Sequence, residues 1–261
     1  MDLSLHKKTA VICGSTQGIG LAIAKELAEL GASCILLARN ESALQKVTAM
    51  LDKSLGQEHN YYVADFSDTV QVKNVIDTIV KTKPPHILIN NTGGPAAGPV
   101  TEATPDSFLQ AFRQHLINNQ LLAQAVLPFM KEQGFGRIIN IISTSVRIPI
   151  DNLGVSNTIR AAVASWAKTL SNEVGRFNIT VNNVLPGYTN TQRLESLIEA
   201  NAAKAGIDKS VQAKKIEEAI PLRRFAEPSE IAAVVAFLAS PAASYVNGVS
   251  LPVDGGKTGS I

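Results

Sequence analysis

The chain has 261 residues, of which 45% are hydrophobic and 18% charged, and its formal net charge is +2. This composition allows a large packed core and gives no indication of disorder or of a general attraction to nucleic acid or anionic membranes. The two cysteines stand in apolar stretches, as buried thiols of a reducing compartment do. The N-terminus has no apolar core of signal-peptide length, and the longest apolar run, 231–239, is too short to span a bilayer. We therefore expect a cytoplasmic protein.

Apolar runs of strand length alternate with segments of helical period, which is typical of βαβ units around a parallel sheet. The predicted strands are 9–13, 33–38, 61–64, 86–90, 137–142, 179–185 and 248–254, and the predicted helices are 21–30, 41–55, 68–81, 105–133 and 153–176. Asn40, Ser67 and Thr104 are placed to cap three of these helices. No linker or repeat interrupts the pattern, so we predict one doubly wound α/β domain over 1–261, with a seven-stranded, mainly parallel sheet and helices on both faces.

The segment 191–220 departs from this rhythm because it is polar, helical in pattern and lies between a strand and Pro221. An insertion after the carboxyl end of a strand lies over the ligand crevice of such a sheet. We interpret this segment as a mobile helical lid over a substrate site.

A glycine-rich turn, "GSTQGIG", joins the first predicted strand to the first helix. Residues without side chains let the backbone approach a diphosphate, whose charge is met by free N–H groups and the helix dipole. A tight turn without a ligand is the alternative. The residues predicted to hold the nucleotide here are Gly14, Ser15, Gly18, Ile19 and Gly20.

The glycine spacing resembles that of the short-chain dehydrogenase/reductase family, and further segments extend the resemblance over essentially the whole chain. These segments are "VADFSD" at 63–68, "INNTG" at 89–93, "LPGYTNT" at 185–191 and "VDGG" at 253–256. The resemblance implies a Rossmann-type site in which Asp65 meets the adenine and Thr191 the nicotinamide carboxamide. It also implies cofactor contacts from Asn90, Asn91, Gly93, Pro186 and Gly187. Pro95 in "GGP" departs from the family's turn and is expected to reshape the nicotinamide face.

The end of the second predicted strand bears on which nucleotide binds. An NAD site usually places Asp or Glu there to bind the ribose hydroxyls, but this strand ends at Arg39, with no carboxylate before Glu41. A guanidinium suits a 2′-phosphate, which a carboxylate would repel. We therefore favour NADP(H) over NAD(H). An arginine that stacks on the adenine or is solvated is the alternative.

The family resemblance also implies four catalytic positions: a serine after the fifth strand, a tyrosine thirteen residues later, a lysine four residues further on and an asparagine in the preceding helix. Ser143 matches, whereas Ser156, Arg160 and His115 stand at the tyrosine, lysine and asparagine positions. A serine is a much weaker acid than tyrosine and is shorter by a ring. Arg160 can hold ribose hydroxyls but cannot shuttle a proton at pH 7. His115 is the first candidate for the missing proton donor, and a histidine that only packs is the alternative.

Two functions follow from this pattern. One is an NADP(H)-dependent oxidoreductase that transfers hydride to or from a carbonyl or secondary alcohol through a rearranged proton relay. The other is a nucleotide-binding protein without efficient catalysis, such as a sensor or scaffold. "GVSNTIRAAVASWAKTLSNEV" (154–174) and "NTGGP" (91–95) also resemble a divergent 3-oxoacyl-acyl-carrier-protein-reductase-like branch that lacks the full catalytic set. The resemblance implies a homo-oligomer, a dimer or tetramer, built on helices 105–133 and 153–176. The expected partner is a small carbonyl or alcohol substrate, with no nucleic acid and no membrane.

Overall fold

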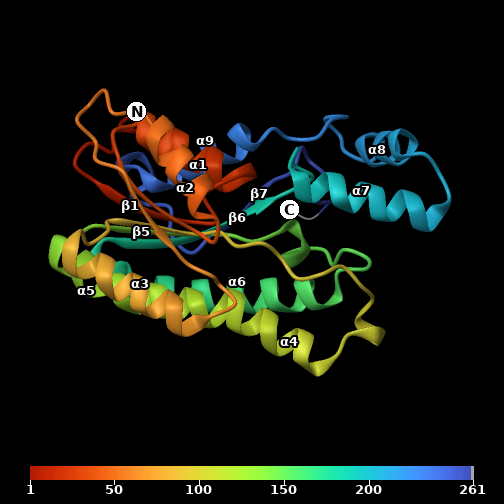
Figure 1. Ribbon diagram of the computed structural model, residues 1–261, viewed down its shortest axis with the longest axis horizontal. Helices are drawn as coiled ribbons and strands as arrows, with labels where there is room; N and C mark the ends of the chain where they lie inside the picture. The colour runs from red at the N-terminus through yellow and green to blue at the C-terminus, as the bar shows by residue number, and fades with distance from the viewer. Residues whose placement is uncertain (260–261) are drawn as a thin grey trace.

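A computed structural model describes residues 1–259, and all seven strands form one sheet (Figure 1). The strands are β1 (Thr9–Cys13), β2 (Ser33–Ala38), β3 (Asn60–Val63), β4 (Ile87–Asn90), β5 (Gly136–Ile141), β6 (Ile179–Pro186) and β7 (Ser250–Val253). Their order is β3-β2-β1-β4-β5-β6-β7, and every neighbouring pair is parallel. The predicted doubly wound fold is confirmed, and the sheet is parallel throughout.

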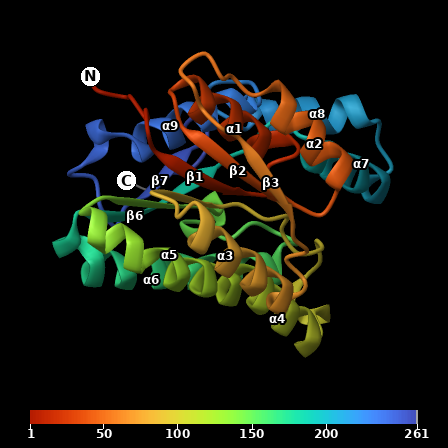
Figure 2. The ribbon, with the colours of Figure 1, turned by 60° about the vertical axis from the view of Figure 1, so that its left-hand side comes forward.

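Helices cover both faces of the sheet. They are α1 (Gly18–Glu29), α2 (Glu41–Met50), α3 (Thr69–Thr82), α4 (Pro105–Phe112), α5 (Asn118–Gln133), α6 (Gly154–Val174), α7 (Gln192–Ala205), α8 (Lys209–Glu218) and α9 (Pro228–Ala239). Helices α1, α2 and α9 lie on one face, and α3, α5 and α6 lie on the other (Figures 1 and 2). Strand β1 is buried on both sides for this reason: Ile12 packs in the first core, and Val11 and Cys13 pack in the second.

Two local predictions at helix ends were wrong. The second helix stops at Met50 instead of continuing to 55, because the Asp52 carboxylate accepts hydrogen bonds from the backbone N–H and hydroxyl of Ser54 and forms a turn. Asp68, not Ser67, caps α3 and accepts from the N–H groups of its first turn. Asn40 and Thr104 cap their helices as predicted.

The long helix predicted over 105–133 is helical throughout but not uniform. Between α4 and α5 the turns widen into a π-helical segment, Arg113–Ile117. Such segments are rare and are frequent at functional sites. This one contains His115, which is buried.

An amide ladder crosses four strands, from the last residue of β4 to the first residue of β7. Asn90 Nδ2 donates to Asn140 Oδ1 at 2.8 Å, and Asn140 Nδ2 donates to Asn183 Oδ1 at 2.9 Å. Asn183 Nδ2 in turn donates to Ser250 Oγ at 3.0 Å. The three asparagines are at most 4% exposed, so the ladder joins β4, β5, β6 and β7 from within the core.

The turns after β1, β4, β5 and β6 meet at one edge of the sheet, where strand order reverses between β1 and β4. The segment predicted as a lid folds as α7 and α8, which project beyond this edge (Figure 1). Lys209 of α8 pairs with Glu195 and Glu199 of α7 at 2.7 Å each. Within residues 1–259, no helix has the length and apolarity needed to cross a membrane.

Candidate active site

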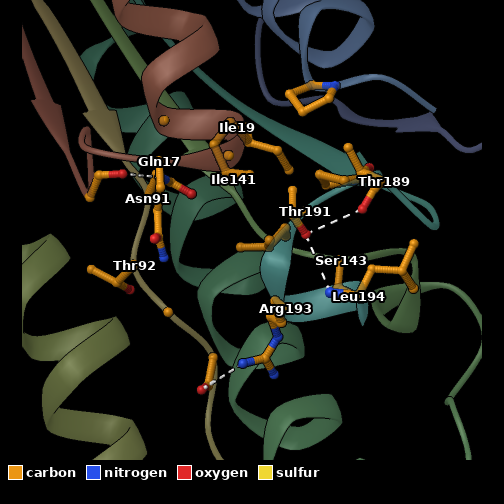
Figure 3. Close-up of a pocket in the computed structure, with 18 of the residues that line it drawn as sticks. Gln17, Ile19, Asn91, Thr92, Ile141, Ser143, Thr189, Thr191, Arg193 and Leu194 are labelled. Carbon is orange, nitrogen blue, oxygen red and sulfur yellow. Dashed lines mark hydrogen bonds between the residues drawn. The ribbon is translucent and has the colours of Figure 1, made fainter. Parts of the chain in front are cut away.

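A cleft of about 1520 Å³ follows the carboxyl edge of the sheet. Figure 3 shows Asn91, Thr92, Ser143, Thr191 and Arg193 around it. Of the residues predicted from the sequence, the following line the cleft: Gly14, Gly18, Ile19, Gly20, Arg39, Asp65, Asn91, Gly93, Ser143, Ser156, Arg160, Pro186, Gly187 and Thr191. Ser15, Asn90 and His115 are buried behind its wall.

The glycine turn is built for close backbone approach. A Cβ atom on Gly20 would lie 2.1 Å from the carbonyl oxygen of Gly14, and one on Gly14 would lie 2.4 Å from that of Asn91. Asn91 Nδ2 closes the turn by donating to the carbonyls of Cys13 and Gly14 at 3.2 and 3.1 Å. Ser15 braces the turn from behind, since its hydroxyl donates to Leu37 O.

The same turn can hold the diphosphate of a dinucleotide. The side chain of Gln17, the N-cap of α1, accepts no hydrogen bond from the first N–H groups of the helix. These groups face the cleft at the positive end of the helix dipole, which favours an anionic ligand. The residues present therefore fit a nucleotide cofactor at this end of the cleft.

Asp65 and Arg39 stand at the far end of the cleft from the catalytic positions. The Asp65 carboxylate accepts from the backbone N–H and hydroxyl of Ser67 at 2.9 and 2.8 Å, and these bonds lower its pKa. Arg39 is exposed, and it forms no ion pair with any residue in 1–259. Its guanidinium is therefore open to a phosphate.

The serine and arginine of the predicted catalytic set lie together at the other end. Ser143 caps the turn after β5, and its hydroxyl accepts from Ser145 N at 3.1 Å. Ser156 and Arg160 are one helical turn apart on α6 and both line the cleft. Arg160 donates to Ile141 O at 2.9 Å and to Thr92 O at 3.5 Å. Burial lowers its pKa to about 10, so the guanidinium stays charged at neutral pH.

His115 is joined to the cleft wall by a hydrogen bond to Thr92. Its Nδ1 lies 2.7 Å from the Thr92 hydroxyl, and its Nε2 has no hydrogen-bond partner among residues 1–259. The imidazole is 2% exposed. Burial lowers its pKa to about 3, with smaller contributions from Arg160 and Arg193. His115 is therefore uncharged at neutral pH.

Three residues of the site were not predicted from the sequence: Thr92, Gly94 and Arg193. Arg193, at the start of α7, donates to the carbonyls of Gly94 and Pro95 at 3.1 and 3.2 Å and so ties α7 to the loop after β4 (Figure 3). The unusual "GGP" sequence indicated a reshaped loop. Nothing in the local sequence links it to a residue 99 positions away.

Comparison with known proteins gives consistent matches over the whole chain. The family described as enoyl-(acyl carrier protein) reductase matches residues 14–258. The 3-oxoacyl-[acyl-carrier-protein] reductase of Pseudomonas aeruginosa is 35% identical over 257 residues, which are 97% of this chain and 98% of that protein. An NADPH-dependent reductase of Bacillus subtilis is 31% identical, covering 98% of this chain and all of its own. The crystal structure of L-sorbose reductase from Gluconobacter frateurii with NADPH and L-sorbose is 30% identical, with a TM-score of 0.93 and full coverage of both chains.

Proposed function

Because the chain belongs to the short-chain dehydrogenase/reductase family of oxidoreductases, we propose that it transfers a hydride between NADP(H) and a carbonyl or secondary alcohol. One observation carries the proposal: a single cleft runs from the glycine turn to Ser143. The nicotinamide, when bound, supplies or accepts the hydride. The work of the protein is to orient the two reactants and to stabilise the charge on the substrate oxygen.

The preference for NADP(H) rests on Arg39. Its open guanidinium just after β2 suits a 2′-phosphate. The similarity to an NADPH-dependent reductase and to an L-sorbose reductase crystallised with NADPH supports this choice. Gly14, Gly18 and Gly20 hold the diphosphate end, and Thr191 lies against this turn, with its Cγ2 3.1 Å from the position of a Cβ on Gly18.

We propose an atypical catalytic set at the reactive end. The Ser143 hydroxyl donates to the substrate oxygen, and the charged Arg160 stabilises negative charge there and binds ribose hydroxyls. Ser156 replaces a phenol with a short hydroxyl and so leaves space in the cleft. His115 is a positioning residue that orients the Thr92 hydroxyl. The proton consumed in reduction reaches the substrate oxygen from solvent, through the hydroxyls that line the cleft.

The proposal is tested by measuring the Kd of NADPH and NADH, followed by turnover on a panel of ketones, oxo acids and secondary alcohols. We expect NADPH to bind at least about tenfold more tightly than NADH, the effect of charged hydrogen bonds to a 2′-phosphate. Arg39→Ala should remove that preference, whereas Arg113→Ala, an exposed arginine outside the cleft, should keep it. Tight binding of NADPH without turnover of any substrate would favour the alternative function as a sensor or scaffold. Failure to bind either nucleotide would refute both the oxidoreductase and the sensor or scaffold.

We also propose that the protein is a cytoplasmic homo-oligomer. Both cysteines are buried as free thiols, which agrees with a reducing compartment. Helices α5 and α6, which the family resemblance places in the interface, are joined by a hydrogen bond of 2.7 Å from Trp166 Nε1 to Gln120 Oε1. Light scattering on the 27.7 kDa chain distinguishes monomer, dimer and tetramer.

A further inference from the structure

Two arginines of the cleft converge on the backbone of Gly94. A Cβ atom built on Gly94 would lie 2.8 Å from Arg193 Nη2 and 3.3 Å from Arg160 Nη2. Because both distances start from the same point, the two Nη2 atoms are no more than about 6 Å apart. At this separation the two positive charges repel each other. A side chain at 94 would have to push the Arg193 guanidinium aside.

Neither arginine forms an ion pair with an acidic side chain of the described residues. Among residues 1–259, no carboxylate lies within 4.0 Å of either guanidinium. Arg160 is 8% exposed, and its guanidinium donates to the backbone carbonyls of Ile141 and Thr92. Burial lowers the pKa of both arginines, and Arg193 contributes to the shift at Arg160. A buried guanidinium without a counter-charge is costly, and an anion held between Arg160 and the exposed Arg193 would remove that cost.

The position of Arg193 adds an independent argument. It lies in the first turn of α7, where the helix dipole disfavours a cation. Its hydrogen bonds to Gly94 O and Pro95 O direct the guanidinium away from α7 and toward the cleft wall (Figure 3). The helix dipole therefore does not favour an arginine here, and the bonds that tie α7 to the loop leave the guanidinium at the cleft, where an anion can bind.

We propose that Arg160 and Arg193 recognise an anionic group of the substrate, a carboxylate or a phosphate. This inference rests on the proposed oxidoreductase function and names its substrate class. The diphosphate of the cofactor has its own site at the glycine turn. Arg160, by contrast, lies one helical turn from Ser156, at the end of the cleft where the reacting oxygen binds. Arg193 extends from the segment predicted to be a lid, so binding of the anion would also hold α7 over the cleft.

The test compares ligands that differ in charge. Hexanoate, hexyl phosphate and the neutral hexanamide are titrated calorimetrically into the enzyme saturated with NADP⁺. We expect at least one anion to bind about tenfold or more tightly than hexanamide, because hydrogen bonds to charged groups are the strong ones. The preferred anion identifies the substrate group as carboxylate or phosphate. Arg193→Gln, at an exposed position, should reduce the preference below about threefold, while the control Arg113→Gln should keep it.

Three results would overturn the inference. The first is equal binding of the anions and hexanamide, and the second is failure of both anions to bind at millimolar concentration. The third is an Arg193→Gln variant that loses NADP⁺ affinity but keeps its preference for anions. The Arg193 guanidinium would then bind the cofactor and not the substrate. Reduction of neutral ketones without any preference for anions would refute this site and leave the proposed function intact. Failure to bind NADPH at all would refute the proposed function itself.

Discussion

Removal of the central amide of the ladder, in Asn140→Leu, should destabilise the protein strongly. Asn140 accepts from Asn90 Nδ2 and donates to Asn183 Oδ1, and both partners are buried. Leucine would leave Asn90 Nδ2 and Asn183 Oδ1 without these hydrogen bonds inside the core. An unsatisfied buried polar group costs about 1–3 kcal/mol, so the two together predict a loss of about 2–6 kcal/mol. This is a large fraction of the roughly 5–15 kcal/mol that stabilises a typical domain.

Urea unfolding followed by circular dichroism measures this loss as a shift of the midpoint at constant slope. Asn74→Leu is the matched control, because Asn74 is exposed on α3 and its substitution should change stability by less than about 0.5 kcal/mol. A loss below about 1 kcal/mol for Asn140→Leu, with an unchanged slope, would refute the reasoning. The amides of Asn90 and Asn183 would then have found other partners.

Three further predictions concern the cleft and the histidine behind its wall. Gly20→Ala should abolish NADPH binding in equilibrium titrations, because its Cβ would lie 2.1 Å from Gly14 O. The double variant Ser156→Tyr with Arg160→Lys should gain reduction of simple ketones by about 10²-fold or more, since it supplies a phenol acid beside a cation. His115→Gln should flatten the pH dependence of stability. The pKa of His115 is about 3 in the native state and 6.5 when unfolded, so its contribution is complete above pH 6.5. It is lost at about 1.4 kcal/mol per pH unit as pH falls toward 3.

Each of these has a contradicting outcome. Nucleotide affinity retained within threefold in Gly20→Ala would show that the turn does not need close backbone packing. A double variant that is folded, binds NADPH and gains no activity would place the proton route outside position 156. An unfolding free energy that falls equally with pH in His115→Gln and in the exposed control His6→Gln would show that His115 titrates normally.

The sequence by itself determined the succession of strands and helices along the chain. Parallel strands that are buried on both faces appear as continuous apolar runs, and the helices between them carry local caps such as Asn40 and Thr104. It also located the glycine turn, whose function depends on missing side chains within a few residues. Only the tertiary structure decided the rest. The burial of His115 and the meeting of Arg160 with Arg193 over Gly94 depend on segments far apart in the chain. The protonation state at these positions depends on neighbours that only the packing brings together, so it cannot be predicted from the local sequence.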